Sequence, residues 1–85
     1  MGCWGDSESD RAIAGDYGKL DAQGCYEKAV SLGYKVFGIS NENSNCYTSP
    51  SGWKTYKKYG ELSCDDARSI AVYETKIGNF LTTAS

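Results

Sequence analysis

Four cysteines in an 85-residue chain that has no histidine are the feature that most constrains the fold. A chain this short buries too little apolar surface for its core alone to make it more than marginally stable, so a cross-link is expected. The cysteines are spread along the sequence without a C-x-x-C pair, and histidine is missing as a zinc ligand. We therefore expect two disulfides formed by Cys3, Cys25, Cys46 and Cys64, with no metal centre and no cofactor.

Two disulfides in a small domain are typical of proteins that fold in an oxidising compartment, so we expect a secreted protein. The opening "MGCWGD" lacks the charged and apolar regions of a signal peptide, which predicts one of several modules excised from a longer chain. No apolar run is long enough for a membrane span. A net charge of −2 and a pI near 4.9 argue against a nucleic-acid partner.

One segment has the pattern of a helix, residues 21–33. Asp21 can cap its N-terminus, and Gly33 is placed to end it in a left-handed conformation. Apolar residues recur at helical spacing along one face of this segment: Ala22, Cys25, Ala29 and Leu32.

The rest of the chain is typical of short strands and turns. Residues 34–40 alternate like a strand covered on both faces, with Val36 on one side and Phe37 and Ile39 on the other. The fold class predicted is α+β, with one helix packed on a small, mainly antiparallel sheet stapled by two disulfides. The other expected elements are an opening strand at 2–6, a polar loop at 7–20, a turn at 41–45, a return strand at 46–48, a helical turn or irregular loop at 53–60, and a closing strand at 69–75. One module, 1–76, is expected, followed by a linker or tail, 77–85.

The positions of the cysteines favour one pairing. Cys25 lies on the helix face that must be buried, and Cys46 lies on the hairpin, so a bridge between them would join the two layers. Cys3 and Cys64 would then tie the opening strand to the segment before the closing strand. The two other pairings remain open at this point.

Several segments between Gly2 and Glu74 together carry a resemblance: GCW, D…RAI, CYEKAVSLGYKVFGISNENSNCYTS, TYKKYG…C and AVYE. In this order they resemble a four-cysteine extracellular module of cnidarian and other marine-invertebrate secreted proteins. They are also similar to a reduced WSC domain and, more distantly, to PAN/apple modules. The resemblance implies a PAN/WSC-like, disulfide-stapled module that occurs in arrays, with carbohydrate binding as in WSC relatives. No ligand residue is carried over from it.

Aromatic residues make up 13% of the chain and mark the first candidate site. Sugars stack their apolar faces on aromatic rings while polar side chains bind the hydroxyl groups. The segment "GWKTYKKYG" offers Trp53, Tyr56 and Lys57 for this purpose. The alternative is that these rings cover the core of a small domain.

The predicted hairpin tip, "NENSNCY", is the second candidate. Asn43 and Asn45 could form a rim that binds hydroxyl groups, with Tyr47 as a platform. Turn formation alone is the alternative explanation for the asparagines, because they favour tight turns for backbone reasons.

The acidic run "DSESD" places Asp6, Glu8 and Asp10 at alternate positions. A calcium loop would need a glycine where Arg11 stands, so a solvated acidic loop is the default interpretation. The alternative is a structural role, in which Arg11 or Arg68 pairs with these carboxylates. No nucleophile, phosphate-binding or metal motif appears, and we expect no enzyme.

The function predicted is that of a lectin-like module that binds glycans or glycoproteins outside the cell. The alternative is a structural or adhesive spacer of the extracellular matrix, without a small-molecule site. A stapled toxin or inhibitor is a third possibility with no specific feature in its favour.

Overall fold

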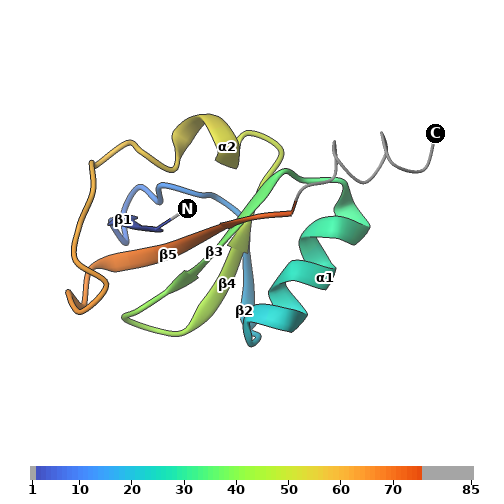
Figure 1. The fold of residues 1–85 in the computed structure, drawn as a ribbon, viewed down its shortest axis with the longest axis horizontal. Coiled ribbons are helices and arrows are strands. Elements are labelled where there is room, and N and C mark those ends of the chain that lie inside the picture. The colour runs from blue at the N-terminus through green and yellow to red at the C-terminus, as the bar shows by residue number, and fades with distance from the viewer. Residues whose placement is uncertain (1, 76–85) are drawn as a thin grey trace.

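The computed structural model describes residues 2–75, so the expected tail at 77–85 lies outside the described residues. The elements follow the order β1 (Gly2–Gly5), β2 (Asp16–Lys19), α1 (Ala22–Leu32), β3 (Val36–Ser40), β4 (Asn45–Thr48), α2 (Gly52–Thr55) and β5 (Ser69–Glu74). Figure 1 shows α1 and α2 on different sides of the strands. The α+β fold class is therefore confirmed.

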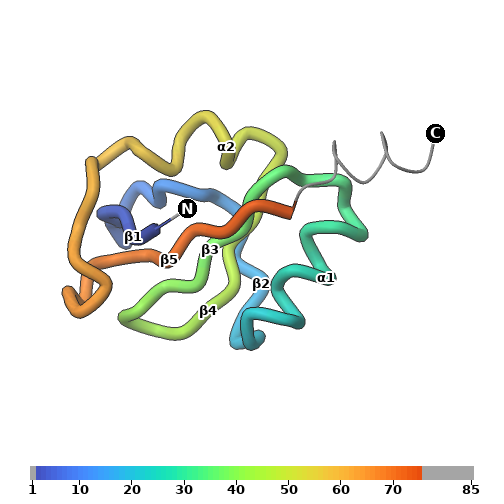
Figure 2. The backbone as a smooth tube through the Cα atoms, in the orientation of Figure 1, coloured from blue at the N-terminus to red at the C-terminus, as the bar shows by residue number. Residues whose placement is uncertain are grey.

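The strands form one antiparallel sheet in the order β1-β5-β3-β4-β2. Strand β3 lies in the middle and pairs with β5 on one side and with β4 on the other. In Figure 2 the chain crosses from edge strand β1 to edge strand β2, and between β4 and β5 it passes from one neighbour of β3 to the other. Residues 7–20 do not form only a loop, because Asp16–Lys19 pairs with β4 as an edge strand.

Helix α1 begins and ends as the sequence predicts. The Asp21 carboxylate accepts a hydrogen bond from the Gly24 backbone N at 2.7 Å, which satisfies a free donor of the first turn. Gly33 has φ = 77°, a left-handed conformation that favours glycine. Cys25 and Ala29 are buried, whereas Ala22 and Leu32, expected on the same face, are exposed, so only the middle of the helix face packs on the sheet.

The two faces of β3 bury two separate apolar clusters, as its alternation predicts. Cys25, Ala29, Phe37 and Cys46 form the cluster under α1, with Leu20, Tyr34 and Ile39 packed against it. The other face carries Ile13, Val36, Tyr47, Tyr56, Ile70 and Val72, with Trp4 packed against them. This second cluster is covered by irregular chain and by α2, since Ile13 and Tyr56 come from those segments.

Gly38 allows the second cluster to pack closely on β3. A Cβ at this position would lie 2.6 Å from Ile70 Cδ1 and 3.2 Å from Ile13 Cδ1, so these two side chains would have to shift to admit it. Gly15 has a similar role beside β4, where it has φ = 80° and a Cβ would collide with the Thr48 carbonyl oxygen. Two close backbone approaches therefore hold the segment around Ile13 against the sheet.

Both disulfides form in the favoured pairing. Cys25–Cys46 joins α1 to β4 and is fully buried. Cys3–Cys64 joins β1 to the segment before β5, and Cys64 is exposed. No helix in residues 2–75 is long and apolar enough to cross a bilayer.

Candidate functional site: a polar groove and an exposed tryptophan

The residues singled out from the sequence do not form one site. Tyr47 lies on β4 and Trp53 on α2. Helix α2 lies near the start of β3, whereas the hairpin tip lies at the end of β3 (Figure 1). Trp53 is within cation–π distance of Lys35, the residue just before β3, whereas Asn43 and Asn45 follow its end. The length of β3 alone separates these regions by roughly 13 Å.

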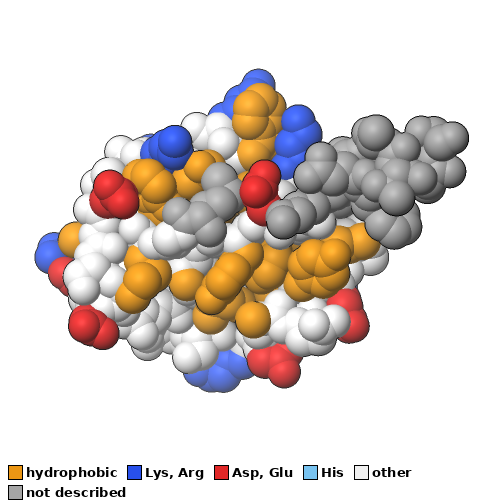
Figure 3. All heavy atoms as spheres, viewed as in Figure 1, with side chains coloured by type: hydrophobic (Ala, Val, Ile, Leu, Met, Phe, Trp, Pro, Cys, Tyr) orange, Lys and Arg blue, Asp and Glu red, His pale blue; other side chains and the backbone are white. Residues whose placement is uncertain are grey.

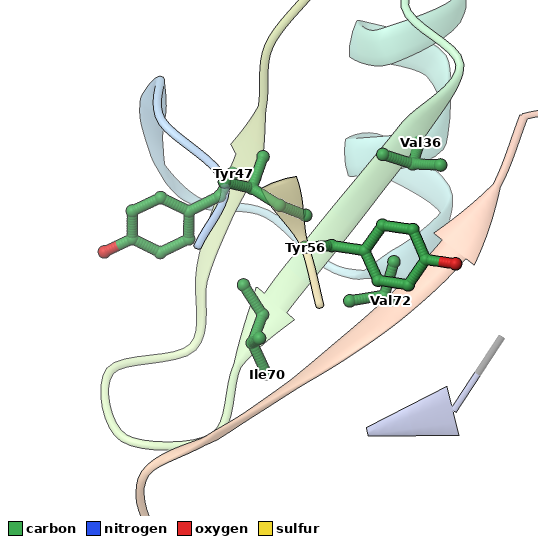
Figure 4. Close-up of a cluster of buried hydrophobic side chains, with 6 residues drawn as sticks. Val36, Tyr47, Tyr56, Ile70 and Val72 are labelled. Atoms are coloured by element: carbon green, nitrogen blue, oxygen red, sulfur yellow. The ribbon is translucent and has the colours of Figure 1, made fainter. Parts of the chain in front are cut away.

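Two of the three candidate aromatic rings belong to the core. Tyr47 and Tyr56 are only 2% and 6% exposed, and both belong to the cluster on the face of the sheet opposite α1. Figure 4 shows the two rings at opposite ends of this cluster, with their hydroxyl groups pointing away from each other. The alternative interpretation, that such rings cover the core, therefore applies to these two residues. Neither offers a ring face for stacking.

A polar groove lies beside the buried Tyr47, between the segment after β1, the hairpin tip and the segment before β5. It consists of two adjoining hollows of about 480 and 490 Å³ that share Glu8, Ser9 and Arg11. The first hollow is also lined by Asp6, Ser7, Ser40, Glu42, Ala67 and Arg68, and the second by Asp10, Ala14, Gly15, Asp16 and Tyr47. We call these residues together the polar groove.

Internal hydrogen bonds fix the floor of the polar groove. Arg11 donates to the Asp6 carboxylate at 2.6 Å, and the Ala12 backbone N donates to the other Asp6 oxygen at 2.9 Å. The Arg11 guanidinium lies 4.8 Å from the centre of the Tyr47 ring. The alternative interpretation of the acidic run, in which Arg11 pairs with one of its carboxylates, thus applies to Asp6, and the ion pair holds the Arg11 guanidinium in place.

The asparagines line neither hollow of the groove and form no free rim; they hydrogen-bond to Asp16 and Tyr47, which do line it. Asn45 donates from Nδ2 to both carboxylate oxygens of Asp16 at 3.0 Å, and Asn43 donates to the Tyr47 hydroxyl at 3.1 Å. The Asn43 side-chain oxygen also accepts from the Asn45 backbone N, which forms the turn. Formation of the turn and hydrogen bonding to Asp16 and Tyr47 therefore explain the positions of the two asparagine side chains.

Two carboxyl groups meet across the first hollow. Glu8 and Glu42 come from different segments, and the hydrogen bond and repulsion between them raise the pKa of Glu42. In the second hollow, the Gly18 backbone N, Asn45 and Tyr47 all favour the ionised form of Asp16 and lower its pKa. The groove is therefore rich in hydrogen-bond acceptors around the guanidinium groups of Arg11 and Arg68. No group of three or more acidic or cysteine side chains in residues 2–75 is arranged to hold a metal ion.

Sequence reasoning missed Asp16 and the enclosing role of the segment after β1. The segment "DYGK" lacks the apolar alternation of a strand, and it pairs with β4 at an irregular register. The signal in the sequence was the apolar pair Ala12 and Ile13. Both are buried in the structure, so the segment after β1 has to pass close to the sheet.

Trp53 stands apart from the groove and is 42% exposed. Lys35 Nζ lies 4.4 Å and Lys54 Nζ 5.1 Å from the centre of its ring. Lys57 Nζ lies 5.5 Å from the Trp4 ring and 5.6 Å from the Tyr56 ring. We call Lys35, Trp53, Lys54 and Lys57 the Trp53 surface; Figure 3 shows lysine or arginine atoms on both sides of apolar atoms over α2.

Comparisons with known proteins found no family model and no curated protein that matches this chain.

Proposed function

We propose that the protein is a glycan-binding module of the extracellular space, lectin-like in action, and that its glycan site is the polar groove. The single observation that carries this proposal is the position of the Arg11 guanidinium between ionisable carboxylates in one hollow of the surface. A sugar hydroxyl donates one hydrogen bond and accepts others, so it suits a site where donors and acceptors alternate.

The charge of the groove favours neutral sugars. Asp6 neutralises Arg11 through a direct ion pair, while Glu8 and Glu42 are in no ion pair with a basic side chain in residues 2–75. The hollow therefore presents carboxylate acceptors to a ligand, and a sulfated or carboxylated sugar would be repelled. Hydroxyl groups of a neutral oligosaccharide can donate to these acceptors without that cost.

The disulfides support the extracellular part of the proposal, since such bridges persist in oxidising compartments. The resemblance to reduced WSC domains, and more distantly to PAN/apple modules, is consistent with it. Open hollows of this kind bind weakly, so copies in tandem on a longer chain would provide avidity. The spacer of extracellular matrix remains the second candidate, favoured by the burial of Tyr47 and Tyr56. We propose no catalytic activity.

A glycan array probed with a multimerised form of the protein tests the proposal. We expect a neutral oligosaccharide to bind and Glu42→Gln to weaken it at least about tenfold, because one acceptor with a full charge is lost. Glu27→Gln is the matched control, since Glu27 is an exposed glutamate on α1 outside the groove. Absence of any neutral ligand, or equal loss in both variants, would favour the spacer.

A further inference from the structure

The Trp53 surface carries a concentration of positive charge on an acidic protein. The chain has a net charge of −2, yet residues 52–60 contain three lysines and no acidic residue. Of these, Lys58 forms an ion pair with Asp10 at 2.6 Å. Lys54 and Lys57, together with Lys35, form no ion pair in residues 2–75. These three ammonium groups lie against aromatic rings and have no carboxylate partner in residues 2–75, so an external anion could pair with them.

The aromatic ring at this surface is held out of the core. Trp53 lies on α2 between buried Gly52 and exposed Lys54, whereas Tyr56, three positions later, enters the core beside Trp4 at a ring distance of 5.3 Å. The backbone N of Tyr56 donates to the Gly52 carbonyl at 3.0 Å, which fixes this division between an inward and an outward ring. An exposed tryptophan flanked by lysines leaves apolar surface in contact with water and contributes no packing to the core.

From these contacts we propose that the Trp53 surface is a second binding site, distinct from the polar groove, for a glycan chain that carries sulfate or carboxylate groups. The indole ring stacks on the apolar face of a sugar unit, which takes the place of a lysine ammonium that lies over the ring in the free protein. Lys35 and Lys54 reach the anionic groups on either side of that unit, and Lys57 extends the positive charge along the chain. Lysine suits this role because its ammonium is a point charge with three donors that needs no fixed ligand geometry.

The ring favours a sulfated or carboxylated glycan over an acidic peptide. Acidic side chains carry charge without a flat apolar face, so a peptide would use the lysines and leave Trp53 unoccupied. A sugar unit uses both at once, and its affinity depends on the ring as well as on the charge. This difference provides the test.

The experiment measures affinity for dextran sulfate oligomers, with unsulfated dextran of the same length and polyglutamate as comparison ligands. We expect dextran sulfate to bind, to bind more weakly as salt rises, and to lose at least about tenfold in affinity in Trp53→Ala. Unsulfated dextran is expected not to bind this surface. RNA and vesicles with anionic lipid serve as further polyanions.

A matched pair of lysine variants separates the site from general charge. Lys54→Gln removes an ammonium beside Trp53, while Lys28→Gln removes one that lies 5.6 Å from the Tyr17 ring, outside the surface. Only the first is expected to weaken dextran sulfate binding, by several-fold. The proposal fails if Trp53→Ala binds as well as the wild type, if both lysine variants lose equally, or if polyglutamate, RNA or vesicles bind with the same affinity and the same dependence on Trp53.

The two sites can be tested separately. Glu42→Gln is expected to leave dextran sulfate binding at the Trp53 surface unchanged, and Trp53→Ala to leave neutral-glycan binding in the groove unchanged. A Trp53→Ala protein with the melting temperature of the wild type shows that the loss is not unfolding.

Discussion

The polar groove and the Trp53 surface use aromatic residues in opposite ways. Tyr47 is buried in the core and also lines the groove, where the Arg11 guanidinium lies 4.8 Å from the centre of its ring, so the groove is shaped by the core itself. Trp53 stands outside the core on a single helical turn. The comparison teaches that the proposed glycan site in the groove is coupled to the stability of the core, whereas the proposed site at Trp53 is not. Changes in the groove wall should therefore affect folding, and changes at Trp53 should affect binding alone.

The largest effect is expected from reduction of the disulfides, which hold two walls of the groove. Cys25–Cys46 anchors β4 next to Tyr47, and Cys3–Cys64 anchors the segment that leads to Arg68. Each bridge is expected to contribute about 3–4 kcal/mol in the chain-entropy model. Thermal unfolding with and without reductant measures their sum.

The exposed bridge should be reduced first under mild conditions, because Cys64 is accessible and the other bridge is fully buried. Thiol labelling followed by mass spectrometry identifies the order. An unchanged melting curve after full reduction would show that the bridges do not hold the groove.

The core variant comes second. Tyr47→Ala removes a buried ring and is expected to lower the free energy of unfolding by about 3–5 kcal/mol. Trp53→Ala is expected to change it by less than about 0.5 kcal/mol, as for an exposed surface residue. Chemical denaturation compares the two. If Trp53→Ala destabilised the protein as much as Tyr47→Ala, the two regions would not differ in the way argued above.

Gly15 provides a smaller test of the same coupling. Gly15→Ala adds a Cβ that collides with the Thr48 carbonyl oxygen, on top of a left-handed backbone with φ = 80°. Gly18 has the same φ of 80° with open space around its Cβ position, so Gly18→Ala isolates the backbone strain. We expect the melting temperature to fall further for Gly15→Ala. Equal shifts would mean that the close approach to β4 contributes nothing.

The smallest expected effect is the pH dependence of the free energy of unfolding that comes from two groove carboxyl groups. Their contributions have opposite signs. The folded-state pKa of Asp16 is lowered, so its stabilisation is complete above the unfolded value of about 3.9 and is lost as the pH falls through the folded pKa. The folded-state pKa of Glu42 is raised, so its ionised form costs stability at neutral pH. That cost disappears as the pH falls through the folded pKa.

Asp16→Asn is accordingly expected to lower stability at pH 7 and Glu42→Gln to raise it slightly. Both differences are expected to shrink as the pH falls, the Glu42 difference first and the Asp16 difference at lower pH. Denaturation at several pH values measures these changes. Lys54→Gln at the Trp53 surface should show no such dependence in this range. A pH dependence of the same sign in both groove variants would contradict the assignment.

The fold could be predicted from the sequence further than the site could. Asp21, Gly33 and the alternation through Val36 and Phe37 are local signals, and the structure follows each of them. The favoured pairing of cysteines followed from the same layers. Edge strand β2 was missed because the residues that hold it, Asp16 and Asn45, act through side chains 29 positions apart.

Only part of the candidate site could be predicted from the sequence, for a related reason. A tyrosine in a strand can be buried or exposed, and the neighbouring segment decides which. The loop through Ile13 covers the face that holds Tyr47 and Tyr56, and that loop had no strong pattern of its own. Trp53 stays exposed because a single turn of helix turns only part of "GWKTY" inward.

A titration of isotope-labelled protein with a neutral oligosaccharide selected on the array, followed by backbone amide NMR, tests the glycan site most directly. The account predicts shifts that saturate at Glu8, Arg11 and Glu42, while the indole N–H of Trp53 does not move. Shifts centred on Trp53, or none at the three groove residues, would contradict it.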